Sequence, residues 1–186
     1  MSVRLLLLPL MLLLAACQST RIERDFDPAR DFGAYRSWSW QEPAVQFRPN
    51  DPRLDSSLTE QRVRAAVADQ LEQRGLRQAP PGSVGDLKVQ AWMIVDQRHT
   101  QVTNYSGGYW GSPWNPYWGM PSYSETRTFD YQVGTLLINL LDGHDGKLVW
   151  RGSAEKVVRR GNASPEERTQ AIREAVARVL SLYPPR

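Results

Sequence analysis

The stretch from Asp86 to Asp96 constrains the fold of this chain more than any other feature, because apolar and polar side chains alternate along it. Successive side chains of a β-strand point to opposite sides of the sheet, so this period predicts a strand with one buried face. The residues expected on that buried face are Leu87, Val89, Ala91, Met93 and Val95. A second layer of structure must therefore cover this side of the sheet.

Three other segments have the character of strands. Trp38 and Trp40 recur at period two, which predicts a strand that ends at Pro43, and residues 44–56 are expected to form a loop. Strand character returns from Thr126 to Leu140, and the turn residues 142–146 connect it to a partner strand. The partner strand is expected to bury Leu148, Trp150, Gly152 and Ala154. The strand tryptophans Trp38, Trp40, Trp92 and Trp150 are expected to pack in the core or on a face of the sheet. Alternatively, Trp38 or Trp40 lines a groove.

Two helices are indicated by their end signals. Ser57 and Glu60 have the spacing of a capping box, and Gly75 can take the left-handed conformation that ends a helix while Leu76 folds back on it. A second capping-box spacing begins at Ser164 and leads to a helix that ends before Pro184. The expected apolar stripes are Val63, Ala66, Val67 and Leu71 in the first helix, and Ile172, Ala175, Val176, Val179 and Leu180 in the second.

The predicted order of elements is therefore β-α-β-β-β-α. Because each strand has one apolar face and each helix one apolar stripe, the expected class is α+β. The expected architecture is a two-layer sandwich with both helices on one face of a mostly antiparallel sheet.

The N-terminus has the features of an export signal. Arg4 precedes an apolar run from Leu5 to Leu14, which is shorter than the roughly 20 residues that a membrane-spanning helix needs. Leu14-Ala15-Ala16-Cys17 resembles the lipobox of bacterial lipoproteins, which implies cleavage before Cys17 and acylation of this cysteine, the only one in the chain. We expect a signal peptide at 1–16, a tether at 17–30 and one domain at 31–186; a plain secreted protein is the alternative.

The residue after the cysteine bears on the membrane that holds the protein. In enterobacterial lipoproteins an Asp at this position favours the inner membrane, and here the residue is Gln18. This resemblance points to the periplasmic face of the outer membrane, with the inner membrane as the alternative. Stable anchoring needs more than one acyl chain, which lipoprotein processing supplies.

The charges exclude one class of partner. The 23 basic and 20 acidic residues are interleaved, and the net charge is only +3. Nucleic-acid binding requires a basic patch or stripe, so we expect no nucleic-acid partner.

Four motifs in order carry a family resemblance: DFDPARDFGAYRSWSW, DPRLDSSLTEQRVRAAVADQLEQRGL, GTLLINLLDGHDGKLVWRGSA and a C-terminal helix ending in YPP. Together they resemble the bacterial lipoprotein family known as domain of unknown function 4136, over about residues 25–185. The resemblance implies an α+β domain on a lipid anchor. It implies no reaction and supplies no catalytic residues.

Candidates for catalysis are few. His99 follows the predicted second strand, and His144 lies beside Asp145 in the Asp-Gly turn, where a relay to a serine is the catalytic hypothesis and a solvated turn the simpler one. Asp142 and Asp145 lack the twelve-residue pattern of a calcium loop. We therefore expect no enzyme activity, metal or cofactor.

The segment from Tyr105 to Tyr123 holds three of the seven tryptophans and four of the seven tyrosines, separated by Gly, Ser, Pro, Asn and Met. This composition predicts a long loop. It could cover the sheet, dock on a protein, or contact lipid, because Trp and Tyr are favoured in all three settings. The candidate partner-binding residues are Tyr109, Trp110, Trp114, Tyr117 and Trp118.

These features favour a non-enzymatic, lipid-anchored envelope protein that binds an envelope protein partner through the aromatic loop. The alternative is an accessory lipoprotein of a lipid or lipopolysaccharide transport machine, and a hydrolase of envelope material is a third hypothesis.

Overall fold

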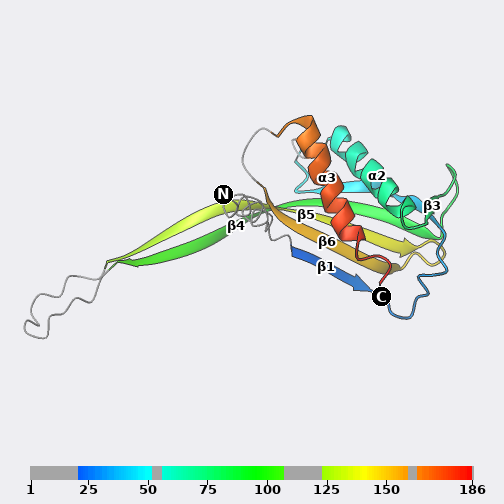
Figure 1. The fold of residues 1–186 in the computed structure, drawn as a ribbon, viewed down its shortest axis with the longest axis horizontal. Helices are drawn as coiled ribbons and strands as arrows, with labels where there is room; N and C mark the ends of the chain where they lie inside the picture. The colour runs from blue at the N-terminus through cyan, green and yellow to red at the C-terminus, as the bar shows by residue number, and fades with distance from the viewer. Residues whose placement is uncertain (1–20, 52–55, 107–122, 159–162, 186) are drawn as a thin grey trace, which may run out of the picture.

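Six strands and two helices make up the computed structural model, which describes residues 21–51, 56–106, 123–158 and 163–185 (Figure 1). The strands are β1 (Arg21–Phe26), β2 (Ser37–Arg48), β3 (Arg77–Gln78), β4 (Leu87–Ser106), β5 (Tyr123–Asp142) and β6 (Leu148–Val158). The helices are α2 (Ser57–Glu72) and α3 (Pro165–Leu180).

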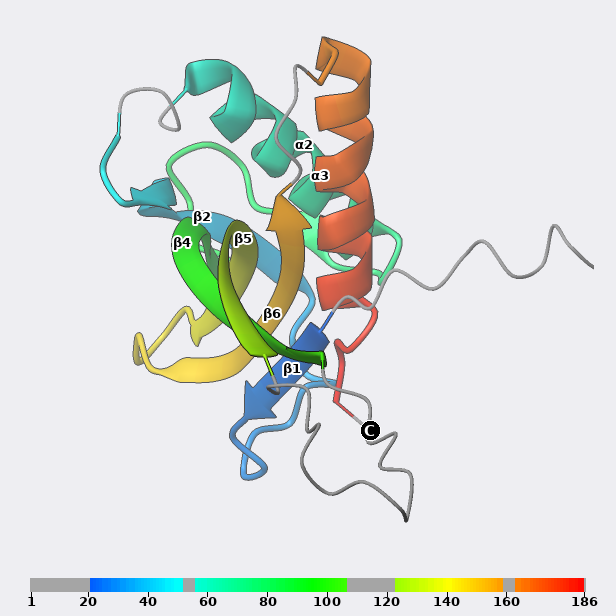
Figure 2. The same ribbon diagram turned by 90° about the vertical axis from the view of Figure 1, so that its left-hand side faces the viewer.

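The strands form one mixed sheet in the order β1-β6-β5-β4-β2-β3. Neighbours from β1 to β4 are antiparallel, whereas β2 runs parallel to both β4 and β3. Both helices lie on the same side of this sheet (Figure 1), which is strongly curled when seen from its end (Figure 2). The mixture of sheet and helices agrees with the predicted α+β class, but the order is β-β-α-β-β-β-β-α because β1 and β3 were not predicted.

The core lies between the sheet and the two helices. The predicted alternation in β4 is confirmed at its start, where Leu87, Val89 and Ala91 are fully buried, whereas Met93 and Val95 are only half-buried where the core ends. Further fully buried side chains of the core are Trp38, Ala44, Ile138, Leu140, Val149, Trp150, Val63, Val67, Leu71, Val176, Val179 and Leu180.

Helix α2 ends as predicted and begins differently. Gly75 has a φ of +83°, and the backbone N–H groups of Leu76 and Gly75 donate to the carbonyls of Leu71 and Glu72. These two bonds define a Schellman motif, and Leu76 is buried beside the last turn. The predicted capping box at Ser57 is wrong, because Ser56 is the N-cap and the Glu60 carboxylate instead accepts a hydrogen bond from Arg64.

The Schellman motif allows a first prediction. Gly75→Ala should destabilise the protein by about 1–2 kcal/mol, because an L-residue pays this cost in the left-handed region. No atom lies within 4 Å of the added Cβ, so packing would not contribute to the loss. Urea unfolding followed by circular dichroism measures it. Gly75→Asn is the control and should lose less, because Asn tolerates this conformation; equal stability of Gly75→Ala and wild type would contradict the prediction.

Helix α3 begins with the predicted capping box. The Ser164 side chain accepts from the backbone N–H of Glu167, and the Glu167 carboxylate accepts from the backbone N–H of Ser164. Pro165 occupies the first helical turn, where a missing N–H costs no hydrogen bond.

Part of the expected tether belongs to the sheet. Residues 21–26 form β1, which pairs antiparallel with β6 from Arg21 opposite Glu155 to Phe26 opposite Trp150. The segment is polar because β1 is an edge strand whose side chains are mostly exposed, so its sequence lacks the apolar alternation of a buried strand.

Strand β2 does not end at Pro43. Its pairing with β4 jumps from Trp40 opposite Val89 to Val45 opposite Ala91, so the residues around Pro43 bulge out of the ladder. A proline has no N–H for the ladder and is accommodated in such an irregularity. The strand then resumes to Arg48, inside the segment that was expected to be a loop.

Strands β4 and β5 are each 20 residues long and extend beyond their predicted ends. Tyr105 and Tyr123, expected to lie in the aromatic loop, are therefore strand residues. Within the described residues, neither helix has the length and hydropathy required to cross a bilayer.

Candidate functional site

The residues that the sequence singled out for lipidation and docking are not among those that the structure describes. Cys17 lies outside the described residues, as do Tyr109, Trp110, Trp114, Tyr117 and Trp118. The two strands that lead into the aromatic segment are described to their ends, where Ser106 pairs with Tyr123. The structure thus places both ends of this segment at the far tip of β4 and β5 (Figure 1).

The outer halves of β4 and β5 project from the domain as a two-stranded ribbon (Figure 1). Pairing of β4 with β2 stops at Ile94, and pairing of β5 with β6 begins at Gln132. From Val95 to Ser106 and from Tyr123 to Tyr131, each strand therefore pairs only with the other among the described strands. We call these residues the ribbon. Within the described part of the chain, no strand pairs with the outer backbone edge of either ribbon strand, and such edges can pair with another chain.

One face of the ribbon is polar. The residues on the side that continues the core face of β4 are paired across the strands as Gln97 with Gln132, His99 with Asp130, Gln101 with Thr128, Thr103 with Thr126 and Tyr105 with Ser124. His99 Nδ1 lies 2.6 Å from Asp130 Oδ1, and the hydroxyls of Thr103 and Thr126 are 3.0 Å apart. Two of these five pairs thus join their side chains across the ribbon.

The opposite face of the ribbon carries apolar side chains. Val102 is 41% exposed and Phe129 is 53% exposed, and they are diagonal neighbours across the strands. Half-buried Tyr131 continues the row toward the domain, where Val157 of β6 is 54% exposed opposite Val133. We call Val102, Phe129, Tyr131 and Val157 the outer stripe. Three of its four side chains are thus at least 41% exposed to solvent.

Ion pairs share the face of the outer stripe. Arg98 binds Glu155 of β6 with a shortest distance of 2.8 Å, which fastens the root of the ribbon to the sheet. Arg127 binds Glu125 at 2.7 Å farther out. The outer face is therefore mixed, with apolar side chains between charged pairs.

The turn between β5 and β6, which carries His144, is held by a network of hydrogen bonds centred on Asp142, which we call the Asp142 lock. Buried Asp142 accepts hydrogen bonds from the Tyr35 hydroxyl, the Arg30 guanidinium and the backbone N–H groups of His144 and Asp145. Burial alone would raise the pKa of Asp142, but these hydrogen bonds and the Arg30 charge lower it. Burial and the bond to Asp142 raise the pKa of Tyr35 to about 12.

The two candidate catalytic residues of this turn are not brought together. The Asp145 carboxylate binds Arg30 at 2.6 Å and accepts from the N–H of Lys147, and these contacts lower its pKa. The His144 side chain is exposed. His99, expected after a strand, lies within β4 on the ribbon and far from His144 in the pairing register. In the described part of the chain, no three side chains of His, Cys, Asp or Glu gather as metal ligands would.

The strand tryptophans divide into two kinds. Trp38 and Trp150 are fully buried. Trp40 is half-buried beneath the Arg64 guanidinium, 5.1 Å from the ring centre, and Trp92 lies beneath Arg48 at 4.7 Å. The cations cover these two rings, so neither ring forms an open groove.

Sequence reasoning missed a cavity of about 590 Å³ between α3 and the sheet. It lies where α3 faces the middle of β5 and the C-terminal end of β6. Its signal in the sequence is slight: alanines on one side of α3 and a glycine, Gly134, in β5.

The structure is thus a small α+β domain from which a two-stranded ribbon projects. Its family follows from the sequence: the model of the domain of unknown function DUF4136 matches residues 22–185. The chain belongs to this family, as the four motifs predicted.

Among the solved structures similar to this chain, two with TM-scores above 0.5 share its fold. A DUF4136 family protein from Bacteroides thetaiotaomicron is 18% identical, with a TM-score of 0.51, over 90% of this chain and 97% of that one. A PDZ domain protein from Parabacteroides distasonis is 14% identical, with a TM-score of 0.52, over 90% of this chain but only 37% of that one. PelC from Paraburkholderia phytofirmans, a dodecamer, is 14% identical with a TM-score of 0.45, over 88% of this chain and 95% of that one.

These likenesses concern the fold and assign no activity to this chain. No curated protein matches the sequence.

Proposed function

We propose that this chain is a non-enzymatic, lipid-anchored binding module of the bacterial envelope, which docks on an envelope protein through the β4–β5 ribbon and the aromatic segment at its tip. The observation that carries the proposal is the ribbon itself. A two-stranded hairpin is at best marginally stable alone in water, and this one receives no cover from the described remainder of the domain.

The chemistry of the ribbon favours a protein over lipid as the partner. Arg98, Arg127 and Glu125 share the face of the outer stripe, and burial of such charges in hydrocarbon costs roughly 2.5–3.5 kcal/mol for an Arg. At a protein interface the same charges can remain at a solvated rim while Val102 and Phe129 are covered. The open backbone edges also offer hydrogen bonds that another protein's backbone can complete.

Anchoring and location are part of the proposal. The lipobox-like sequence supports acylation at Cys17, and Gln18 supports the outer membrane, periplasmic face. Only residues 18–20 separate Cys17 from the first residue of β1. Such a chain spans at most roughly 3.3–3.6 Å per residue, so the domain would be held close to the membrane surface.

The experiment that tests docking is photo-crosslinking in living cells. A photoreactive residue is placed at Phe129 on the outer stripe, at Trp114 in the aromatic segment, and at Arg173, an exposed α3 residue that serves as the control. We expect one discrete adduct with another envelope protein from Phe129 and Trp114, and none from Arg173.

Two results would contradict this proposal. An adduct with the mass of two copies of this chain would replace the hetero-partner with self-association. A correctly localised, folded variant that yields lipid adducts alone, or none, would exclude protein docking through the ribbon. In the first case the ribbon remains an interface, and in the second an accessory role in lipid transport becomes the better hypothesis.

A further inference from the structure

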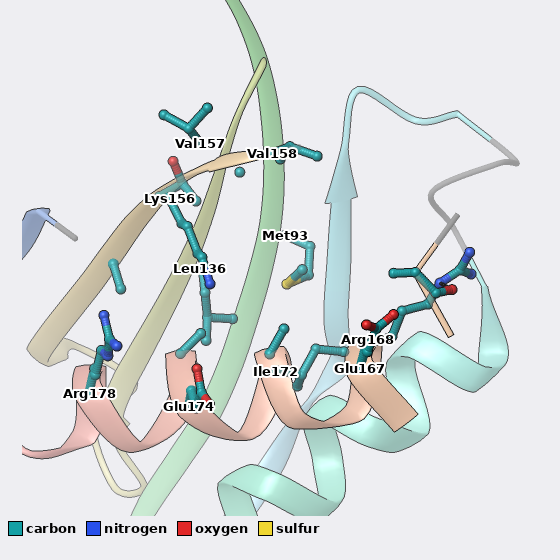
Figure 3. A pocket seen from close by; sticks show the side chains of 16 residues that line it. Met93, Leu136, Lys156, Val157, Val158, Glu167, Arg168, Ile172, Glu174 and Arg178 are labelled. Atoms are coloured by element: carbon teal, nitrogen blue, oxygen red, sulfur yellow. Dashed lines mark hydrogen bonds between the residues drawn. The ribbon is translucent and has the colours of Figure 1, made fainter. Parts of the chain in front are cut away.

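The cavity beside α3 is an open trench with an apolar lining. Met93 of β4 and Leu136 of β5 lie on its sheet side, and Ile172 of α3 faces them (Figure 3). Ala154 of β6 also lines it. Its volume of about 590 Å³ lies within the roughly 300–1,000 Å³ of pockets that hold small-molecule ligands.

The trench exists because the N-terminal half of α3 packs less closely on the sheet than its C-terminal half does. Val176, Val179 and Leu180 in the second half of the helix are fully buried, whereas Ile172 is half-buried and Ala171 exposed. The first half of α3 is instead held by α2, where Arg62 Nε donates to Thr169 Oγ1 at 3.0 Å.

Small residues leave the trench unfilled by the side chains of the described residues. Gly134 contributes none, and a Cβ built there would lie 3.2 Å from Val158 Cγ2. The remaining small lining residues are Ala154, Ala163, Ala171 and Ala175. Close-packed interiors seldom leave an apolar space of this size unfilled, so the lining suits an apolar group from outside the chain.

The rim supplies a charge for the other end of such a molecule. Lys156 extends from β6 toward α3 at the mouth of the trench (Figure 3) and forms no ion pair within the described part of the chain. The lining carries two carboxylates, Glu167 and Glu174, which accept hydrogen bonds from the neutral donors of Ser164 and Gln170 and remain charged. Against them stand three cations, those of Lys156, Arg168 and Arg178, so the lining has a net charge of +1, which favours an anion.

We propose that this trench binds a single-chain anionic amphiphile, with its alkyl chain along Met93, Leu136 and Ile172 and its anionic head at Lys156. A fatty acid and a monoacyl phospholipid share this chemistry. The site is separate from the outer stripe, so the inference does not depend on protein docking.

The test uses the full-length chain, exchanged from detergent into amphipol, and a photoreactive stearate. We expect adducts on peptides of β5 and of α3 that contain Leu136 and Ile172. Unlabelled competitors from decanoate upward should bind more tightly as the chain lengthens, by about fourfold for each methylene buried, until the trench is full. Stearate and a stearoyl lysophospholipid are then compared, and the tighter competitor identifies the head group.

Variants separate the two parts of the site. Ala171→Trp should abolish labelling by filling the trench from an exposed position on α3. Lys156→Glu should weaken binding by about fivefold through charge reversal. Lys147→Glu is the matched control, because it reverses an exposed lysine in the turn at the other end of β6 and should bind as wild type does.

Some results would overturn the inference. Labelling scattered over the surface, affinity independent of chain length, or unchanged labelling of a folded Ala171→Trp variant would exclude the trench as a ligand site. Equal binding of stearate and stearyl alcohol would exclude the anionic head group. Unfolding curves of each variant establish that loss of labelling is not loss of structure.

Discussion

Asp142→Ala is expected to reduce the free energy of unfolding by about 2–3 kcal/mol, the upper part of the usual cost of leaving buried hydrogen-bond donors unsatisfied, since Arg30 keeps Asp27 and Asp145 as partners. The Asp142 side chain is 8% exposed and accepts from four donors. Its loss leaves the Arg30 charge and the Tyr35 hydroxyl without this acceptor, and it frees the turn that joins β5 to β6. Urea unfolding of the full chain at neutral pH measures the change.

The control for this substitution is Asp31→Ala. Asp31 is an exposed loop residue whose side chain accepts from the backbone N–H of Gly33, so its removal should cost far less. If Asp142→Ala lowers the free energy of unfolding by less than about 1 kcal/mol, the loss would match a single solvated hydrogen bond. That result would show that the hydrogen bonds of Asp142 do not stabilise the fold as a network.

The pH dependence provides a second readout of the same lock. Because the folded-state pKa of Asp142 is lowered, its stabilising effect is complete above the ordinary Asp pKa of about 3.9 and is lost as the pH falls through the lower folded value. The difference in stability between wild type and Asp142→Ala should therefore shrink in acid. A difference that stays constant between neutral pH and pH values below that range would contradict the assignment.

Trp150→Ala should cost about 3–5 kcal/mol, the usual loss for a buried Trp or Phe replaced by Ala. Trp150 is fully buried, and its ring packs edge-on against Tyr183 with 5.6 Å between ring centres. Gly152 makes room for the indole, since a Cβ there would lie 2.4 Å from Trp150 Cη2. The substitution leaves a large apolar cavity beneath α3.

Trp150→Phe distinguishes packing from hydrogen bonding in the same position. The Trp150 Nε1 atom has no hydrogen-bond partner in the described structure, so loss of the N–H should cost nothing and the variant should recover most of the stability. Trp92→Ala, at a half-buried ring, should lose less than Trp150→Ala. The packing explanation fails if Trp150→Phe is as unstable as Trp150→Ala.

Local signals explain which elements could be predicted. The ends of α2 and α3 depend on a few adjacent residues, so Gly75 and Ser164 could be assigned correctly from the sequence. Strand β1 is held by β6, whose residues are more than a hundred positions away, and its own polar sequence gives no sign of that pairing. The continuation of β2 past Pro43 likewise depends on β4, which accepts the bulge.

The candidate site also combines features that local sequence indicates with features that depend on distant residues. Aromatic residues at 105–123 indicated a special segment, and most of β5 leading away from it was predicted as a strand. The part of β4 beyond Asp96 was not predicted, because both faces of the ribbon are largely exposed and its sequence there lacks apolar alternation. The trench depends on the angle at which α3 leaves the sheet, and no short stretch of sequence encodes that angle. Neither the outer stripe nor the position of Lys156 at the rim of the trench could be recognised before the strands were aligned.

Strand β1 also gives the domain a mechanical property. Any pull on the residues before Arg21 enters the fold through this strand, whose six residues are each paired with β6. The hydrogen bonds of an antiparallel pair lie perpendicular to the strands, so a pull along β1 loads them together in shear. Force from the N-terminal side would thus be shared by the whole length of β1 rather than opening its pairs one after another.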